Sequence, residues 1–429
     1  MDLVNKIKKI SVEKKNIFKN YTAMGIIQIL NYIIPFITLP YLSRILAVDK
    51  FGLIFFAQAI MDYCTRFVDF GFNQSGVREL SINRDCKGNV DKIFSSIFFA
   101  KLGLLFFSFV ILSIVICIFN KFRNDYLIYY FTFLSVVGNV LLSSWFFQGI
   151  ERMKFITFFN IITRSISLIC IFSFVKLQED YLLVPLFNSL GLLIAGMVSL
   201  ITIIIRFKVN LQIPQITDVI NKLKDSSEYF LSSISIGLYQ STNTFFLGLC
   251  VSTTMVAYYV SAQKIYLAIY FLYYPFYNAF FPYMSKNKDI KFFKKVFKIL
   301  IIFSLGLTAF LLLFAKPIIT IFYGEQMLES YKILQIFAII FPFHILADIM
   351  SFPLLGAFGY TKETNQCWIF AGIFHLIAIS LLYLSNLLNI YSVSILFAIT
   401  YILMFLHRIY YVKKYKLLNI KENTWNSKI

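Results

Sequence analysis

Long apolar runs separated by short polar segments repeat along the chain from residue 25 to residue 411. A bilayer core of about 30 Å requires about 20 helical residues, each rising about 1.5 Å. The runs have roughly that length and are bounded by charged or turn-forming residues, so each predicts a membrane-spanning helix. The twelve predicted spans are residues 25–46, 52–72, 93–119, 126–147, 155–175, 181–205, 229–251, 255–283, 299–315, 331–358, 366–386 and 390–411.

Composition agrees with this pattern. Hydrophobic residues make up 59% of the chain and charged residues only 14%, whereas soluble domains are about half apolar and about a quarter charged. A water-soluble fold could not bury so much apolar surface, and the chain is predicted to be an all-α integral membrane protein. The six cysteines show no CxxC spacing, so neither a disulfide framework nor a metal site is expected.

Basic residues orient the predicted spans. The net charge is +19, but no basic solvated domain exists that would suggest a nucleic-acid partner. Most Lys and Arg residues lie in the N-terminal segment, in every second connection and after the last span. The densest clusters are residues 285–298 and 408–428. Because basic residues are retained in the cytoplasm, we expect both termini and these clusters on that side of the membrane.

The connections on the opposite side are only a few residues long, the longest being about residues 316–330. A membrane-embedded polymerase or glycosyltransferase would need a larger extramembrane segment, and the sequence has no DxD or GxxxxGK[ST] phosphate motif. Catalysis is therefore not expected. Any site must lie between the helices.

A weak internal repeat divides the chain. Ala57, Gln58 and Ile60 match Ala262, Gln263 and Ile265 in an AQxI pattern, although chance could also produce so short a match. A parallel repeat would give two six-helix halves related about the membrane normal. We expect an N-terminal lobe of residues 1–210 and a C-terminal lobe of residues 211–429 with the basic tail, arranged around a central cleft suited to alternating access.

Several strings over most of the chain carry a family resemblance. They are PYLSRILAVDKFGLIFFAQAIMDY, DFGFNQSGVREL, SSWFFQGIERMKFITFFNIITRSISL, VAYYVSAQKIYLAIYF and PLLGAFGYTKETN. Together they resemble the Wzx-type flippases of bacterial O-antigen and capsule clusters, in the multidrug/oligosaccharidyl-lipid/polysaccharide exporter superfamily. The chain departs at Ala47, where that family usually has Gly after the SRxL run, so the turn there can differ.

The resemblance implies a function, a location and partners. It implies a twelve-helix, two-lobed flippase of the bacterial inner membrane. The flippase would move undecaprenyl-pyrophosphate-linked oligosaccharide from the cytoplasmic to the periplasmic leaflet. Its expected partners are this lipid, membrane lipids, and a polysaccharide polymerase with a chain-length regulator. No cofactor is expected beyond coupling to a proton or sodium gradient.

Cationic residues within the spans are the candidates for binding a pyrophosphate, because a charge inside the membrane is costly and an anionic headgroup needs cations in transit. The candidates are Arg44, Arg66, Arg164 and Lys264. Arg164 is the best, since its own helix offers no acid in reach. Neighbouring acids could neutralise Arg66, and Arg44 could reach lipid phosphate instead.

The tenth predicted span carries His344, Asp348 and Ser351 one turn apart. A His–Asp pair inside a dry bundle could take up and release a proton as access alternates, or it could be a static hydrogen-bonded pair. His375 stands alone in the next span and is expected to be a hydrogen-bonded core residue.

Two further alternatives remain open. A tyrosine stripe in the eighth span could stack on sugar rings, but ordinary packing is the simpler interpretation. It comprises Tyr259, Tyr266, Tyr270, Tyr273 and Tyr277. A drug/cation antiporter of the same superfamily is the alternative function, although several cations within the spans would repel a cationic substrate.

Overall fold

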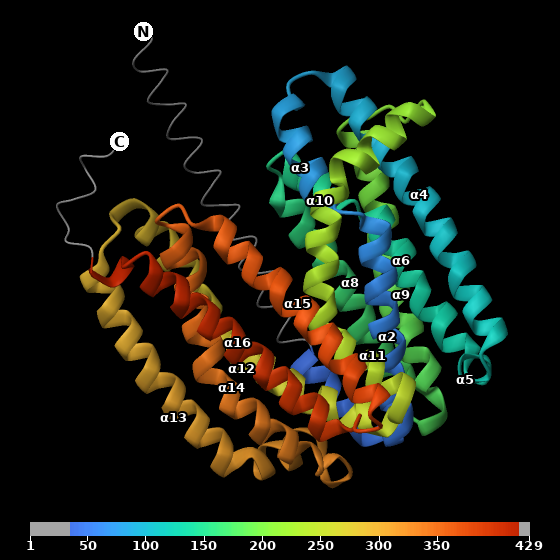
Figure 1. Ribbon diagram of the computed structural model, residues 1–429. Coiled ribbons are helices and arrows are strands. Elements are labelled where there is room, and N and C mark those ends of the chain that lie inside the picture. Colours follow the sequence, from blue (N-terminus) through green and yellow to red (C-terminus); the bar gives the residue numbers. More distant parts are fainter. Residues whose placement is uncertain (1–34, 420–429) are drawn as a thin grey trace. The chain divides into compact units, whose positions relative to one another are not determined.

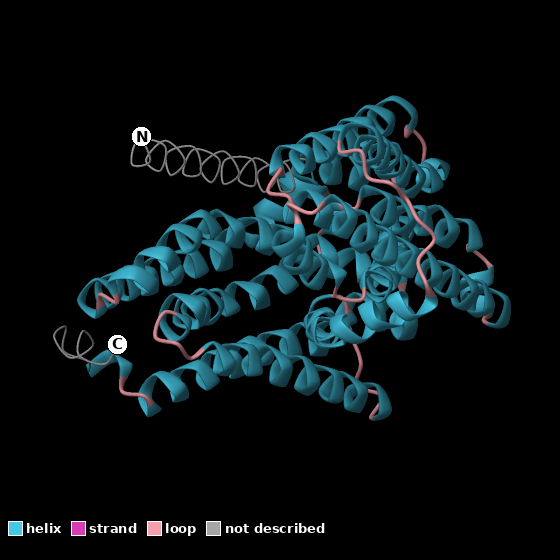
Figure 2. Ribbon diagram, turned by 90° about the horizontal axis from the view of Figure 1, so that it is seen from above, coloured by secondary structure: helices cyan, strands magenta, loops and turns pink. Residues whose placement is uncertain are grey.

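The computed structural model describes residues 35–419 of the chain. Within this range the chain forms helices joined by short connections and contains no strand (Figure 2). The predicted all-α fold class is therefore confirmed. The contacts between Cα atoms divide the chain into two compact units.

The first unit includes residues 57–234 and, within the described range, residues 35–39. Here α6 packs against α9, and α9 packs against α8 (Figure 1). In the same unit α3 packs against α7. Its helices are the second part of α2 (Val48–Asp69), α3 (Phe72–Asn83), α4 (Lys87–Ile118), α5 (Asn120–Arg123), α6 (Tyr126–Leu142), α7 (Ser144–Gly149), α8 (Met153–Phe174), η1 (Gln178–Leu182), α9 (Leu183–Ile201), η2 (Thr202–Arg206) and most of α10 (Ile216–Gln240).

The second unit includes residues 40–56 and the chain from residue 235 onward. Its central helix is α14, which packs against α12, α13 and α16 (Figure 1). Besides the first part of α2, the helices are α11 (Thr242–Phe246), η3 (Leu247–Val251), α12 (Thr253–Asn287), α13 (Ile290–Tyr323), η4 (Glu325–Met327), α14 (Ser330–Met350), η5 (Ser351–Gly356), α15 (Thr361–Leu384), α16 (Ile390–Lys414) and η6 (Leu417–Asn419).

Unit boundaries fall inside α2 and α10, at Phe56/Ala57 and Ile234/Ser235. The sequence places the boundary between the lobes at residues 210 and 211. That division into residues 1–210 and 211–429 stays a prediction.

Ten helices in residues 35–419 are long and apolar enough to cross a membrane. They account for ten of the twelve predicted spans. Of the first predicted span, residues 25–46, residues 25–34 lie outside the described residues and residues 35–45 are helical. The seventh, residues 229–251, is interrupted at Ser241, after which α11 and η3 form a shorter apolar helix from Thr242 to Val251.

Side-chain caps mark where the long helices of the second unit begin. Ser252 Oγ accepts a hydrogen bond from the Met255 amide at 3.2 Å, and Asp289 Oδ1 accepts one from the Phe292 amide at 2.8 Å. Asn389 forms a capping box with Ser392 at the start of α16. Each cap satisfies an amide that the first helical turn leaves unpaired. The turns between spans are thus encoded locally.

Candidate functional site

A cluster of polar side chains is buried in the second unit between α12, α14 and α16. We call it the Asp348 cluster, and its members are Tyr266, Tyr270, His344, Asp348 and Arg408. His344 and Asp348 lie one turn apart on α14, with His344 Nε2 3.6 Å from Asp348 Oδ2. Both residues are buried. The pair predicted from sequence spacing therefore exists, and it has further partners.

Tyrosines of α12 meet the pair in a regular register. The Tyr266 hydroxyl lies 2.5 Å from His344 Nδ1, and the Tyr270 hydroxyl donates to Asp348 Oδ2. The Tyr270 and His344 rings also stack, with centroids 3.9 Å apart. The earlier tyrosine of α12 contacts the earlier residue of the α14 pair, and the tyrosine one turn later contacts the residue one turn later. The two helices therefore run in the same direction. That direction is expected for two spans separated by one other.

Arg408 completes the cluster from α16. Its Nη1 lies 3.0 Å from Asp348 Oδ1, and its guanidinium lies over the Trp368 ring, 4.8 Å from the centroid. The Arg408 residue is 0% exposed. A buried arginine next to a carboxylate offsets the cost of placing either charge in an apolar interior. Asp348 thus contacts a cation on one oxygen and a phenol on the other.

His375 belongs to a second buried hydrogen-bond chain in the same unit. Its Nε2 lies 2.7 Å from Asn243 Oδ1 and its Nδ1 lies 2.8 Å from Thr400 Oγ1, while Asn243 Nδ2 donates to the Tyr259 hydroxyl at 2.8 Å. The expectation that His375 is a hydrogen-bonded core residue is confirmed. Neither cluster offers a metal site: residues 35–419 contain no group of three or more His, Cys, Asp or Glu side chains placed to hold a metal ion.

Most of the tyrosine stripe is core. Tyr259, Tyr266, Tyr270 and Tyr273 are buried, and the first three have the partners named above. Of the two interpretations of the stripe, packing therefore describes these four residues.

In the second unit, Arg44 and Lys264 have specific contacts. Arg44 Nη2 donates to the carbonyl of Ile321 at 2.8 Å, in the last turn of α13. A cation there satisfies a free carbonyl and opposes the negative end of the helix dipole. Lys264 Nζ lies over the Phe55 ring, 5.6 Å from its centroid. Arg44 is exposed and Lys264 is half-buried.

In the first unit, Arg66 and Arg164 are both half-buried. Arg66 Nη1 donates to the carbonyl of Ser233 on α10 at 3.1 Å. Its helical neighbour Asp69 is engaged with other groups: Asp69 Oδ1 accepts from Lys101 Nζ at 2.7 Å and Oδ2 accepts from Asn73 at 2.9 Å. The prediction that Arg164, Arg66, Lys264 and Arg44 line one cationic cavity stays a prediction.

The sequence matches a known protein family. The family model described as "Polysaccharide biosynthesis protein" matches residues 17–288, more than half of the chain. The chain belongs to this family. The predicted relationship to polysaccharide flippases of the exporter superfamily is thereby confirmed at the level of the family.

Two curated relatives span nearly the whole chain. Each is named "Putative O-antigen transporter" and is 27% identical to this chain. The Escherichia coli (strain K12) protein aligns over 86% of this chain and 90% of its own length. The Shigella dysenteriae protein aligns over 92% of this chain and 98% of its own length.

Solved structures share the fold. The inward closed conformation of the lipid II flippase MurJ superposes with a TM-score of 0.66 at 17% identity, covering 94% of this chain and 89% of that one. An inward-facing multidrug resistance MATE family transporter gives a TM-score of 0.63 at 14% identity, covering 92% of this chain and 99% of that one. These similarities show that this member of the polysaccharide biosynthesis family has the helical fold of the exporter superfamily.

The sequence pattern does not predict that two cations of this family member, Arg408 and Lys101, are buried. The sequence pattern predicts Arg408 in the basic cytoplasmic cluster at residues 408–428, but this residue lies inside α16 and pairs with Asp348. A signal for its burial exists: it continues the buried face of Tyr401, Met404 and Val412 at helical spacing. Lys101, which is 1% exposed and paired with Asp69, is not among the cations that the sequence pattern singles out.

Proposed function

We propose that the protein is a flippase that moves undecaprenyl-pyrophosphate-linked oligosaccharide units from the cytoplasmic to the periplasmic leaflet of the bacterial inner membrane by alternating access. One observation carries the proposal. The chain belongs to the polysaccharide biosynthesis family and aligns over most of its length with two O-antigen transporter relatives. The fold shared with a lipid II flippase supports transport of a lipid-linked sugar. Relatives named as transporters also favour transport over catalysis.

Cations within the spans support an anionic substrate. Arg164 lies on α8 and is half-buried, and Lys264 lies on α12 with its ammonium over an aromatic ring. Arg or Lys side chains facing a water-filled path would stabilise the pyrophosphate while it is away from bulk water. We assign Arg164 the main role in contacting the headgroup, with Lys264 and Arg66 in support. Arg44, bonded to the end of α13, contributes less to this site.

The Asp348 cluster is our proposed coupling site. A proton on Asp348 would weaken its attraction to Arg408, which lies 3.0 Å away, and would change the packing of α14 against α16. His344 lies beside the same carboxylate and could exchange the proton. Asp348→Asn is then expected to stop transport. His344→Gln is expected to shift its pH dependence.

Export of surface polysaccharide in a strain deleted for this gene tests the function. The wild-type chain should restore display, and Arg164→Ala should insert normally but fail to restore it, with lipid-linked units accumulating on the inner leaflet. Arg123→Ala is the matched control because Arg123 is an exposed cation at a predicted outer connection. Full display with Arg164→Ala would remove Arg164 from the substrate site.

Proteoliposomes loaded with lipid-linked oligosaccharide test the coupling. Transport should be faster with an imposed proton gradient and should not respond to it in Asp348→Asn. Equal rates with and without proton or sodium gradients would contradict coupling while leaving the flippase function intact. Transport of cationic drugs, with no movement of the lipid, would instead favour the alternative function of a drug/cation antiporter.

A further inference from the structure

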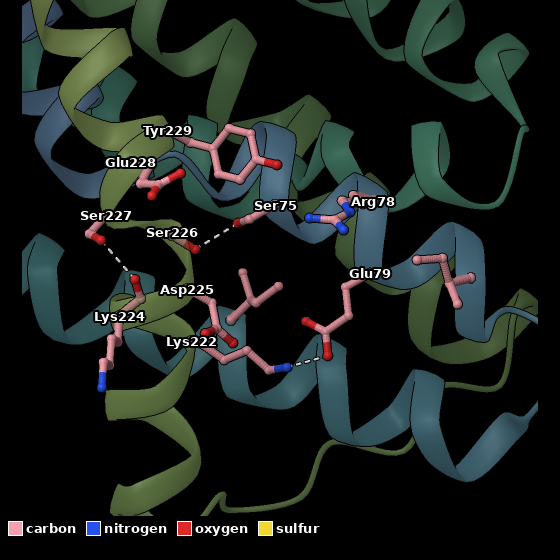
Figure 3. Close-up of a pocket in the computed structure, with 12 residues that line it drawn as sticks. Ser75, Arg78, Glu79, Lys222, Lys224, Asp225, Ser226, Ser227, Glu228 and Tyr229 are labelled. Atoms are coloured by element: carbon pink, nitrogen blue, oxygen red, sulfur yellow. Dashed lines mark hydrogen bonds and ion pairs between the residues drawn. The ribbon is translucent and has the colours of Figure 1, made fainter.

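A groove of about 610 Å³ lies in the first unit between α3 and the first half of α10 (Figure 3). Its volume is within the range of about 300–1,000 Å³ found for small-molecule sites. The groove is separate from the spans that carry Arg66 and Arg164, and the proposed transport site does not use it. Both segments that form it adjoin predicted cytoplasmic connections. It would therefore face the side from which the substrate is loaded.

Internal contacts fix the two walls of the groove. Lys222 of α10 forms an ion pair with Glu79 of α3, and the hydroxyls of Ser75 and Ser226 lie 2.6 Å apart (Figure 3). Gly71, just before α3, has a φ of +79°, and a Cβ there would lie 2.7 Å from the Phe230 amide nitrogen. The helices are thus held closely together at one end. The groove is a built feature of the unit, not a gap between loosely placed helices.

Three charged side chains along the groove can form hydrogen bonds with a ligand. Arg78, Asp225 and Glu228 line it, and none has a side-chain hydrogen bond or ion pair with the chain between residues 35 and 419. All three are exposed. The Tyr229 ring lies near the Ser75 and Arg78 side of the groove in Figure 3. Donors, acceptors and one aromatic ring therefore line the same space.

Charge decides which part of the substrate this space suits. The basic residues Arg78, Lys222 and Lys224 are equal in number to the acidic residues Glu79, Asp225 and Glu228. A pyrophosphate needs an excess of positive charge, and carboxylates nearby would repel it. Sugar hydroxyls both donate and accept hydrogen bonds, so they can use carboxylates and guanidinium together, and a tyrosine ring can pack on the apolar face of a sugar.

We propose that this groove is a glycan subsite, which holds sugars of the lipid-linked oligosaccharide on the cytoplasmic side before translocation. The proposal rests on the flippase function proposed above. It adds recognition of the carbohydrate, apart from the lipid and pyrophosphate. Arg78, Asp225 and Glu228 supply the hydrogen-bonding groups, and the Lys222–Glu79 ion pair keeps the groove in shape.

Binding measurements on the full-length protein in nanodiscs test the subsite. The probes are the lipid-linked repeat unit extracted from the strain that carries this gene, undecaprenyl pyrophosphate without sugar, and the lipid-free oligosaccharide released from the first by mild acid. The test variant is Arg78→Gln/Asp225→Asn. The control is Lys87→Gln/Asp85→Asn, which makes the same type of change at exposed residues of the same unit outside the groove.

The test variant should bind the glycosylated lipid at least about tenfold more weakly, equivalent to about 1.4 kcal/mol. Its affinity for undecaprenyl pyrophosphate should be unchanged. The free oligosaccharide should compete with the glycosylated lipid on the wild type and on the control variant, and much less on the test variant. An unchanged melting temperature would show that the groove variant is folded, since the Lys222–Glu79 and Ser75–Ser226 contacts are retained.

Equal binding of the glycosylated lipid by the test variant and the wild type would overturn the subsite. Equal weakening for both lipids would also overturn it, because the groove would then bind a headgroup or phospholipid and not sugar. A wild-type protein that binds neither lipid would reject the proposed function, and this inference with it. Normal wild-type binding with no effect of the variant rejects only the subsite.

Discussion

Asp348 shows how one residue can gather several neighbours inside a membrane protein. Its two carboxylate oxygens have different partners, the Arg408 guanidinium on one and the Tyr270 phenol on the other. A charge at this depth is tolerated only because its partners replace water. Asp348 and Arg408 therefore depend on each other, because loss of either residue leaves the charge of the other buried and unpaired.

Removal of Arg408 alone should be strongly destabilising. Arg408→Met should lower the free energy of unfolding by about 3–5 kcal/mol, the typical cost of breaking a buried ion pair from one side. Adding Asp348→Leu should recover much of that loss, since no uncompensated charge then remains. Thermal unfolding of the purified protein measures both effects, with Arg123→Met as the exposed control. Additive losses in the double variant would show that the two residues are not coupled.

Within the second unit, the helices α2 and α12 pack very closely at Gly52. The beginning of α2 approaches the beginning of α12 so closely that a Cβ on Gly52 would lie 1.7 Å from the carbonyl oxygen of Thr253. Small residues at such crossings allow backbones to meet, which is a major source of helix association in membranes. Both segments belong to the second unit. Gly52 thus holds the first part of α2 within this unit.

Gly52→Ala should therefore separate α2 from α12. The obstacle is backbone and not a flexible side chain, so the expected loss of stability is at least about 1–3 kcal/mol, as in overpacked cores. Gly103→Ala is the matched control, because a Cβ there meets nothing within 4 Å and α4 is a continuous helix. It should cause no loss. Melting temperatures of the two variants give the comparison, and equal values would mean that α2 does not need this close approach.

The orientation of the whole chain in the membrane can be tested by a direct experiment. The segment 285–298 is rich in lysine and is predicted to be cytoplasmic. Residue 385 directly follows α15, at the end of a predicted span that leads to a short connection predicted to be outside. Ser285 and Ser385 are both exposed. Cysteines at either position should be reachable from the adjoining solution.

In a cysteine-free background, Ser385→Cys should react with a membrane-impermeant maleimide added to intact cells from the periplasmic side. Ser285→Cys should react only after the membrane is opened. The pair is matched, since both replace an exposed serine at the end of a helix. Strong labelling of Ser285→Cys in intact cells would reverse the predicted orientation. It would also place the groove of the first unit on the opposite side of the membrane.

The fold class, the positions of ten described spans and the family could all be predicted from the sequence alone. Apolar runs of about 20 residues can satisfy their backbone hydrogen bonds inside lipid only as helices, so span positions follow from local composition. The His344–Asp348 pair was also visible, since residues four apart on a helix share one face. Caps such as Asn389 are likewise encoded within a few residues.

Charge pairs between different helices depend on the tertiary structure. Arg408 and Asp348 are 60 residues apart, and Lys101 and Asp69 are 32 apart. Spacing along the sequence cannot reveal such pairs. The groove between α3 and α10 likewise brings together residues far apart in the chain. Periodicity places a residue on one face of its own helix, but its partner depends on which helices pack together and in what register, a property of the folded chain as a whole.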